Sequence, residues 1–326
     1  MVTAIEPLLR EQLIDRRHKL ENAAAGFAEA TEISRLLAEV DDALHRMELG
    51  TYGICDYCDE PVETERLIAN PLTRLCIDHL SAREQRALED DLELAGQIQT
   101  GLLPQPSLKV DGWEVAFHYQ PARIVSGDYC DLITNSDQSF LFVLGDVSGK
   151  GVAASMLMAH LQAMFRTLIS INLPLEEMLE RASRVFCEST LPTHYATLAC
   201  GKADATGQIE ISNAGHLPPL LIRKGKVNKL EANGLPVGVF CSQHFSVDRF
   251  RMEQGDTLFL YTDGLSESLD GTGSEYGVSR LSELLCKNHD LSPKQLIATC
   301  LREVDAFRAG SSVNDDLTLM AIQRVH

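Results

Sequence analysis

The sequence predicts an α+β protein in which a helical region is followed by a larger region of antiparallel sheets with segregated helices. Residues 6–48 are rich in Leu, Ala, Glu and Arg, with apolar residues at helical spacing. Beyond Ser107, short apolar runs are separated by Gly, Asp and Asn, and three helical stretches interrupt them. Many strands with segregated helices favour antiparallel sheets, and 326 residues are enough for about two domains.

The composition and net charge of the chain exclude some classes of protein. The chain is 44% hydrophobic and 23% charged, as in ordinary globular proteins, and its formal net charge is -18. Such an acidic protein lacks the basic face that non-specific nucleic-acid binding needs. The N-terminus lacks the basic-then-apolar order of a signal peptide, and no apolar run approaches the roughly 20 residues that span a bilayer. We expect a cytoplasmic protein with no membrane contact and no direct nucleic-acid binding.

The first segment, residues 1–48, is predicted to form a helical hairpin or one long broken helix. Apolar positions recur at helical spacing at Ile33, Leu37, Val40, Leu44 and Met47. A continuous helix is weakest at Ala24-Ala25-Gly26. Two roles stay open for this segment: a coiled-coil surface for a partner, or a helical pair packed on its own domain.

The second segment, residues 49–80, has the ligand spacing of a structural zinc site. Cys55 and Cys58 form one Cys-x-x-Cys pair, and after seventeen residues Cys76 and His79 form a Cys-x-x-His pair. Four such ligands complete a tetrahedron, so no position is left open for catalysis. The chain has nine cysteines, an odd count that favours thiols or metal ligands over a disulfide framework.

This segment resembles the zinc finger of the DksA/TraR family, transcription regulators that contact RNA polymerase. The matching residues are GTYGICDYC at 50–58, ERLIANP at 65–71 and CIDH at 76–79. The family usually has a fourth cysteine where this chain has His79. The acidic tip residues that those regulators use on polymerase have no match here, so the resemblance implies the zinc site but not the transcriptional activity.

Residues 81–103 are predicted to form a linker helix. Apolar residues three or four apart, at Leu88, Leu92, Ala95, Ile98 and Leu102, make a stripe that Pro104 and Pro106 end. Two roles stay open: a lever or dimer seam that enters the next domain, or an inert spacer.

The last segment, residues 104–326, carries the predicted strands and helices. The strands are WEVAFHY, FLFVLGD, ATLACGKAD, QIEISNAGH, PPLLIRKGK, DTLFLYTDG and DDLTLMAI; the helices run over 152–171, 175–189 and 292–307. Acidic residues stand at strand ends in four places: Asp128 with Asp131, Asp146, Asp263, and the pair Asp315-Asp316 after Asn314. Each alone is typical of a turn. Together, these hard oxygen ligands suit Mg²⁺ or Mn²⁺, and a pair of such ions can activate water for phosphoryl transfer.

Other catalytic motifs fit less well. In Gly145-Asp-Val-Ser-Gly-Lys150-Gly151, a P-loop would need Ser or Thr at position 151, so Lys150 receives no phosphate-binding role. No Gly-x-Ser-x-Gly turn is present. The cysteines of this segment show no metal spacing, and we expect most of them to be small core residues. His216 is either an acid catalyst or a structural residue.

Residues 98–320 resemble the SpoIIE/RsbU branch of the metal-dependent PPM serine/threonine phosphatases. The matching motifs are Ile98-Gln99 with Leu102-Leu103-Pro104, Pro121-Ala122-Arg123 with Ser126-Gly127-Asp128-Tyr129, GDVSGKG at 145–151, NAGH at 213–216, GLPVG at 234–238, Gly255-Asp256 with YTDG and Glu267, and DDLTL at 315–319. Ser126 and Cys130 depart from the usual Gly and aromatic residue. The resemblance implies an αββα sandwich of two antiparallel sheets flanked by helices, with two metal ions at one edge.

The same resemblance assigns roles to residues. Asp146 would bridge the two Mn²⁺ or Mg²⁺ ions with help from the backbone carbonyl of Val147; Asp263 and Asp315 would complete one metal site and Asp128 the other. Asp316 would support these ligands without binding an ion. Water between the ions would attack phosphoserine or phosphothreonine in line. Arg123 would hold the phosphate through its guanidinium fork or be an ordinary surface arginine.

Relatives in this branch usually act on a phosphorylated anti-anti-sigma protein and are controlled through the helix that enters the phosphatase. We therefore predict a phosphoprotein phosphatase regulated through residues 81–103, with a homodimer through that helix as one arrangement. The alternative function is a non-catalytic transcription adaptor that binds RNA polymerase through the finger. The four intact acidic positions favour the enzyme.

Overall fold

The computed structural model describes residues 2–24, 31–80, 82–135, 138–171, 173–310, 313 and 315–325. Contacts divide the chain into two compact units, Met1–Asp91 and Leu92–His326. The helix α4 (Ala82–Leu102) continues from the first unit into the second.

The first unit contains two long helices and a small cysteine-rich segment. Its helices are α1 (Val2–Ala24), α2 (Thr31–Leu49), α3 (Thr64–Ala69) and the 3-10 helix η1 (Ile77–His79). α1 packs against α2, and Leu9, Leu13, Val40 and Ala43 are fully buried between them and the cysteine-rich segment. The helix break predicted at Ala24-Ala25-Gly26 lies mostly outside the described residues.

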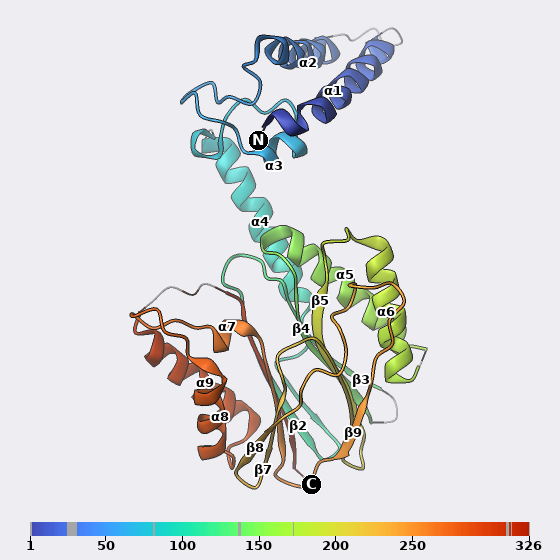
Figure 1. The fold of residues 1–326 in the computed structure, drawn as a ribbon, viewed down its shortest axis with the longest axis vertical. Coiled ribbons are helices and arrows are strands. Elements are labelled where there is room, and N and C mark those ends of the chain that lie inside the picture. Colours follow the sequence, from blue (N-terminus) through green and yellow to red (C-terminus); the bar gives the residue numbers. More distant parts are fainter. Residues whose placement is uncertain are drawn as a thin grey trace. The chain divides into compact units, whose positions relative to one another are not determined.

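The second unit is built on two antiparallel sheets (Figure 1). One has six strands in the order β1 (Ser107–Val110), β2 (Trp113–Gln120), β11 (Leu317–Arg324), β10 (Thr257–Tyr261), β7 (Leu220–Arg223) and β8 (Lys226–Lys229). The other has five, in the order β3 (Asp128–Thr134), β4 (Phe140–Val147), β5 (Ala196–Ala203), β6 (Gln208–Ala214) and β9 (Asp248–Arg251).

Helices cover the outer face of each sheet, which gives four layers (Figure 1). α5 (Gly151–Ile169) and α6 (Leu175–Ser189) contact the five-stranded sheet, whereas α8 (Gly277–Lys287) and α9 (Pro293–Arg308) contact the six-stranded one. The short α7 (Asp263–Ser266) follows β10 directly. Two antiparallel sheets flanked by helices are the fold class that the sequence predicts.

The continuous apolar runs of the central strands follow from burial on both faces. In β4, Phe140, Phe142 and Leu144 face the other sheet, whereas Leu141 and Val143 face α5 and α6. Because side chains alternate along a strand, a strand between two apolar layers needs apolar residues at every position.

One helix and two cysteines differ from the sequence expectations. α5 is long and apolar enough to span a membrane by length and composition alone; here Met158, Leu161 and Phe165 bury it against the five-stranded sheet. Cys187 and Cys241 form a disulfide, so the expectation of thiols was wrong for this pair. Their separation of 54 residues gave no signal, because spacing does not reveal disulfide connectivity.

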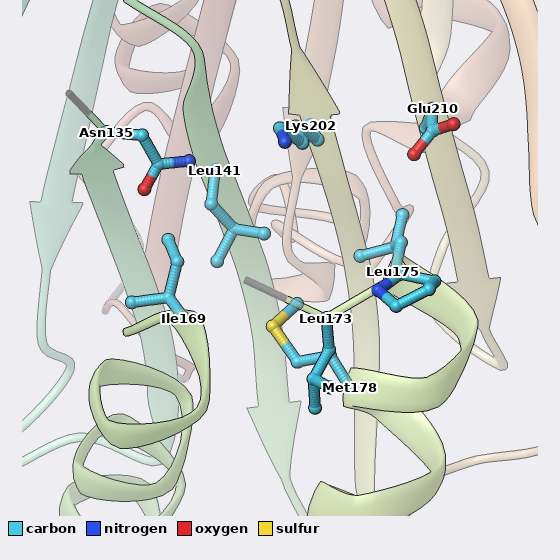
Figure 2. A pocket seen from close by; sticks show the side chains of 9 residues that line it. Asn135, Leu141, Ile169, Leu173, Leu175, Met178, Lys202 and Glu210 are labelled. Atoms are coloured by element: carbon cyan, nitrogen blue, oxygen red, sulfur yellow. The ribbon is translucent and has the colours of Figure 1, made fainter. Parts of the chain in front are cut away.

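A cavity of about 250 Å³ lies between the end of α5 and the start of α6 (Figure 2). Figure 2 shows the apolar side chains of Leu141, Ile169 and Met178 at one side of it and the polar side chains of Lys202 and Glu210 at the other. Leu141 lies at the start of β4, and Asp146 lies near the end of that strand. This cavity is therefore distinct from the acidic cluster described next.

Candidate metal centres

The predicted acidic residues meet at one edge of the two sheets. In the five-stranded sheet, Asp128 begins β3 and is paired in register with Asp146 near the end of β4. In the six-stranded sheet, Asp263 follows the end of β10, and Asp315 precedes the start of the neighbouring strand β11. Strand pairing thus brings the acidic residues of each sheet together, and the packing of the two sheets brings residues more than 100 positions apart to one edge.

Asp128 links the two sheets beneath this edge. Its carboxylate Oδ2 accepts hydrogen bonds from the hydroxyls of Thr262 and Thr318, at 2.9 and 2.5 Å, and both threonines belong to the opposite sheet. Burial raises the pKa of Asp128 well above its usual range, and the charges of Asp146 and Asp316 add to the rise. The hydrogen bonds from the two threonine hydroxyls oppose that rise. They also hold the buried carboxylate in place through one of its oxygens.

Asp146 and Asp263 line a cavity of about 360 Å³ beside this link. Burial, followed by the charges of Asp263, Asp315 and Asp316, raises the pKa of Asp146 to about 7. Burial and Asp315 likewise raise the pKa of Asp263. Each of these carboxylates is thus less stable as an anion because of the others, which is the electrostatic condition that a bound cation relieves.

The donor set is of the kind that hard divalent ions prefer. Carboxylate oxygens are the ligands that Mg²⁺ and Mn²⁺ prefer. In the part of the chain that the structure describes, no three carboxylates converge to within 4.8 Å of one another, although the three cysteines and one histidine of the first unit do.

Glycine makes room for this arrangement at two points. A Cβ on Gly127 would lie 3.2 Å from both the Oδ1 atom of Asp146 and the carbonyl oxygen of Val147. A Cβ on Gly264 would lie 2.0 Å from the carbonyl oxygen of Asp316, a distance that no side chain tolerates. The Asp146 carboxylate and the Val147 carbonyl therefore both lie beside Gly127.

Lys150 contacts the acidic cluster directly. Its Nζ atom donates to Oδ2 of Asp315 at 2.8 Å, and this hydrogen bond raises the pKa of the lysine. Arg123 is exposed on the loop between β2 and β3 and is not among the residues that line the cavity. The sequence pattern predicted no role for Lys150, but within the described part of the chain Lys150 contacts the cluster, whereas Arg123 makes no hydrogen bond or ion pair with it.

His216 is fixed in the wall of the cavity as a neutral residue. It is buried, and burial lowers its pKa to about 4. Its Nε2 atom lies 3.1 Å from the carbonyl oxygen of Tyr261, and its Nδ1 atom lies 2.9 Å from Oγ1 of Thr197. Both nitrogens are thus engaged with backbone or hydroxyl groups of the two sheets, which favours the structural of its two predicted roles.

Two further aspartates have roles in holding the backbone. Asp316 accepts hydrogen bonds from the backbone N–H groups of Ala122 and Gly127, at 2.7 and 2.9 Å, and so holds the loop that carries Arg123. Asp131 forms a bidentate ion pair with Arg166 of α5, at 2.9 and 2.6 Å, on the helix-covered side of β3. Asp131 therefore does not join the cluster, although it stands three residues from Asp128.

Glu267 is a cluster residue that the sequence analysis did not single out as a ligand. It lines the cavity with Asp263, and burial followed by the charge of Asp263 raises its pKa. The sequence could have indicated this role, because Glu267 stands four residues after Asp263 and one helical turn places such residues on the same face.

The linker helix α4 contacts the loop that leads into β3. The Gln99 side chain donates to the carbonyl oxygen of Ser126 at 2.7 Å and accepts from the N–H of Ser126 at 3.0 Å. The Ser126 hydroxyl in turn accepts a hydrogen bond from the N–H of Asp128, at 3.0 Å. Two hydrogen-bonded steps thus join the helix to a candidate ligand.

The first unit gathers the four predicted zinc ligands. The ligand atoms of Cys55, Cys58, Cys76 and His79 all lie within 4.8 Å of one another. The Sγ atoms of Cys58 and Cys76 are 3.7 Å apart, close to the edge of about 3.8 Å that a tetrahedron of Zn–S bonds requires. The set of three thiols and one imidazole therefore fits a structural zinc ion in chemistry and size.

The surroundings of this group are fixed by packing and hydrogen bonds. The ring of Tyr57 stacks on that of His79 with centroids 4.4 Å apart. Burial raises the pKa of Cys76 to about 11, and its hydrogen bonds to the sulfurs of Cys55 and Cys58 add to the rise. Burial opposes ionisation of Cys55 as well, but hydrogen bonds from backbone groups and from the Cys76 side chain outweigh it and lower the pKa of Cys55 to about 6, so a cation at the centre would stabilise the thiolate there.

Two family models match the chain. Residues 136–325 match the model described as Stage II sporulation protein E (SpoIIE). Residues 50–78 match the prokaryotic dksA/traR C4-type zinc finger. The second match ends one residue before His79, the ligand at which this chain departs from a four-cysteine set. Both resemblances predicted from the motifs are confirmed.

Individual proteins give the same picture. Protein IcfG of Synechocystis sp. is 27% identical over 263 residues, which are 72% of this chain but only 41% of IcfG, so the chain spans less than half of that relative. Phosphoserine phosphatase RsbU of Bacillus subtilis is 23% identical over 248 residues, 74% of this chain and 72% of RsbU. The solved SiaA-PP2C domain of Pseudomonas aeruginosa is 19% identical with a TM-score of 0.65 over 74% of this chain and 98% of that domain, which confirms the predicted fold class.

Proposed function

The chain belongs to the SpoIIE family, whose model matches more than half of it, and on that basis we propose that it is a metal-dependent phosphoprotein phosphatase specific for phosphoserine and phosphothreonine. The observation that carries the proposal is the meeting of Asp128, Asp146, Asp263 and Asp315 at one edge of the two sheets, where burial and neighbouring carboxylates raise the pKa of Asp128, Asp146 and Asp263. Buried or half-buried carboxylates this close repel one another unless cations are bound between them. The same cations can activate water for hydrolysis of a phosphoester.

The chain's own residues would hold and orient the reacting groups. Asp146, with the Val147 carbonyl, would bridge two Mn²⁺ or Mg²⁺ ions; Asp263 and Asp315 would complete one site and Asp128 the other. When bound, these ions lower the pKa of a water molecule so that hydroxide attacks the phosphorus. No protein nucleophile is needed, and the cavity's Ser148 hydroxyl is occupied as the acceptor for the N–H of Tyr195.

The substrate is proposed to be a phosphorylated anti-anti-sigma (STAS) type regulator in a partner-switching pathway. The support is the likeness to RsbU, which is named a phosphoserine phosphatase and is matched over most of its length. A phosphatase with this substrate would act in the cytoplasm, which is the location that we propose.

The experiment that tests the phosphatase proposal is hydrolysis of p-nitrophenyl phosphate and of a phosphoserine protein by the full chain. We expect release of phosphate that depends on Mn²⁺ or Mg²⁺, that is abolished by EDTA and that returns when the ion is added back. Protein that stays inactive on both substrates with every divalent ion, while circular dichroism shows it folded, would favour the non-catalytic adaptor.

Control is proposed to pass through α4, which would also form the seam of a homodimer. Gly96 and Gln99 face the phosphatase unit, since a Cβ on Gly96 would lie 2.7 Å from the carbonyl oxygen of Ile124. Of the predicted apolar stripe, Leu92, Ala95 and Leu102 are half-buried, whereas Leu88 and Ile98 are exposed. Exposed apolar residues and a contact to Ser126 on the same helix suit a helix that reports on pairing.

The seam is tested by charge substitution on the exposed stripe. We expect the wild type to sediment as a dimer and Ile98→Lys to weaken dimerisation by at least about tenfold, because the charge would be buried in the seam. Gln97→Lys, at an exposed polar neighbour, serves as the matched control and should stay dimeric. A wild-type protein that is monomeric at micromolar concentration would contradict the proposed dimer interface.

The first unit is proposed to hold one structural zinc ion and to act as the regulatory module of the phosphatase. Contact with RNA polymerase is a second candidate role, supported by the match to the dksA/traR finger. Co-purification of polymerase subunits with the tagged full chain, lost when Cys55 and Cys58 are both replaced by Ser, would support that role; no retention of polymerase would count against it.

A further inference from the structure

Large apolar side chains are exposed on two loops beside the acidic cavity. Leu191 and Tyr195, between α6 and β5, are 66% and 43% exposed; Leu235, Val239 and Phe240, between β8 and β9, are 54%, 41% and 57% exposed. We call these five residues the apolar rim. Single exposed apolar residues are ordinary, whereas a contiguous group of them marks an interaction surface.

The two loops of the rim run side by side. Ala196 and Val237 exchange two backbone hydrogen bonds, of 2.9 and 2.8 Å. A Cβ on Gly238 would lie 3.4 Å from the carbonyl oxygen of His194, so the loops are in van der Waals contact there. The five side chains therefore belong to one surface.

The second loop is held against α6. The disulfide Cys187–Cys241 joins the loop to that helix. The Ser183 hydroxyl accepts hydrogen bonds from the N–H of Gly238 at 3.1 Å and from the Gln243 amide at 3.3 Å. A surface fixed in this way needs little ordering when a partner binds, which lowers the entropic cost of association.

The rim continues into the cavity that holds the acidic residues. Tyr195 belongs to the rim and also lines the cavity with Asp146 and Asp263. The N–H of Ser148 donates to the carbonyl oxygen of Tyr195, and the N–H of Tyr195 donates to the Ser148 hydroxyl, both at 2.9 Å. The rim is thus bonded directly to the Gly145–Gly151 turn, and a macromolecule that brings a phosphate to Asp146 lies against it.

We propose that the apolar rim is the docking surface for the substrate, and that the substrate is a protein whose phosphorylated residue is flanked by apolar side chains. This inference rests on the proposed phosphatase function. The rim carries no charged side chain, and the chain's net charge of -18 disfavours substrates with acidic flanks. Apolar contact is therefore the available source of affinity beside the phosphate.

The test uses two phosphoserine peptides of equal length and charge, one flanked by Leu and Phe and the other by Ser and Gly. Fluorescence anisotropy measures their binding to the full chain loaded with Ca²⁺, so that no turnover is needed. We expect the wild type to bind the apolar peptide about tenfold more tightly, as burial of one large apolar side chain provides. Phe240→Ser and Leu191→Ser, one from each loop, should each lower that ratio about threefold.

Ile171→Ser is the matched control, because Ile171 is 54% exposed beyond the C-terminal end of α5, at the opposite end of that helix from Lys150. It should leave the ratio unchanged. Equal binding of the two peptides by the wild type, or equal losses for both peptides in the rim variants, would overturn the proposal. A dimer that becomes monomeric in both rim variants would instead assign the rim to self-association. Hydrolysis of p-nitrophenyl phosphate by the same wild-type sample reports separately on the phosphatase function.

Discussion

Asp146→Asn is expected to lower the turnover of p-nitrophenyl phosphate and of a phosphoserine protein by about a thousandfold, which corresponds to about 4 kcal/mol of lost transition-state stabilisation. Asp146 lines the cavity, and the neighbouring aspartates Asp263, Asp315 and Asp316 all raise its pKa. An amide has nearly the same shape but supplies no negative charge to bridge two cations. Initial rates at saturating Mn²⁺ measure the effect.

The same substitution is expected to stabilise the metal-free protein at alkaline pH. The pKa of Asp146 is raised to about 7 in the folded protein, against about 3.9 in an unfolded chain. The folded state thus binds this proton more tightly, and the stability that the protonated carboxyl contributes is lost as the pH rises through about 7. Asn is neutral at every pH, so Asp146→Asn should melt above the wild type at pH 8, and the difference should vanish near pH 4.

Asp290→Asn is the control, because that side chain is 91% exposed and lies outside the cluster. It should change neither turnover nor melting temperature. Retention of more than about a tenth of wild-type turnover by Asp146→Asn would show that Asp146 does not bridge the catalytic ions. A lower melting temperature for that variant at pH 8 in EDTA would show that its carboxylate is not repelled by its neighbours.

The central strands could be predicted because burial on both faces leaves a strong signal. FLFVL and the LFLY of residues 258–261 are apolar at every position, and both form strands of the sandwich. Four strands were not predicted because they lack such runs: β1, β8 and β9 lie at sheet edges with mostly exposed or half-buried residues, and β3 contains Asp128 and Asp131. These two aspartates interrupt the apolar pattern of β3. Asp128 belongs to the acidic cluster and Asp131 to the ion pair with Arg166, and both arrangements depend on tertiary contacts.

The candidate site shows the same division between local and long-range information. Strand-end carboxylates were visible in the sequence because Asp146 and Asp263 stand at or just after the ends of apolar runs and Asp315 stands just before one. The contact of Lys150 with Asp315 was not visible, since 165 positions separate them and only the packing of the two sheets brings them together. The hydrogen bonds of His216 to Tyr261 and Thr197 were hidden for the same reason.

Removal of zinc is expected to unfold the finger segment, residues 50–80. A small segment with three thiols and one imidazole at its centre depends on the metal, and structural zinc sites contribute about 10–16 kcal/mol of apparent binding free energy at neutral pH. Elemental analysis should find about one zinc per chain. Cys55→Ser should lose it, and amide hydrogen exchange should rise across residues 50–80 while strands β4 and β11 stay protected.

Two variants separate loss of zinc from loss of a cysteine. Cys286→Ser, a half-buried thiol of the second unit, should keep both zinc and protection. His79→Cys should keep them as well, because it restores the C4 ligand set of the matching family and zinc accepts either ligand. Its exchange in residues 50–80 should equal that of the wild type within about twofold. If Cys55→Ser retained zinc at the wild-type ratio, or if protein prepared without chelators contained none, the four residues would be ordinary thiols and an imidazole. The fold of the segment would then have to rest on the packing of Tyr52, Val62 and Leu67 alone.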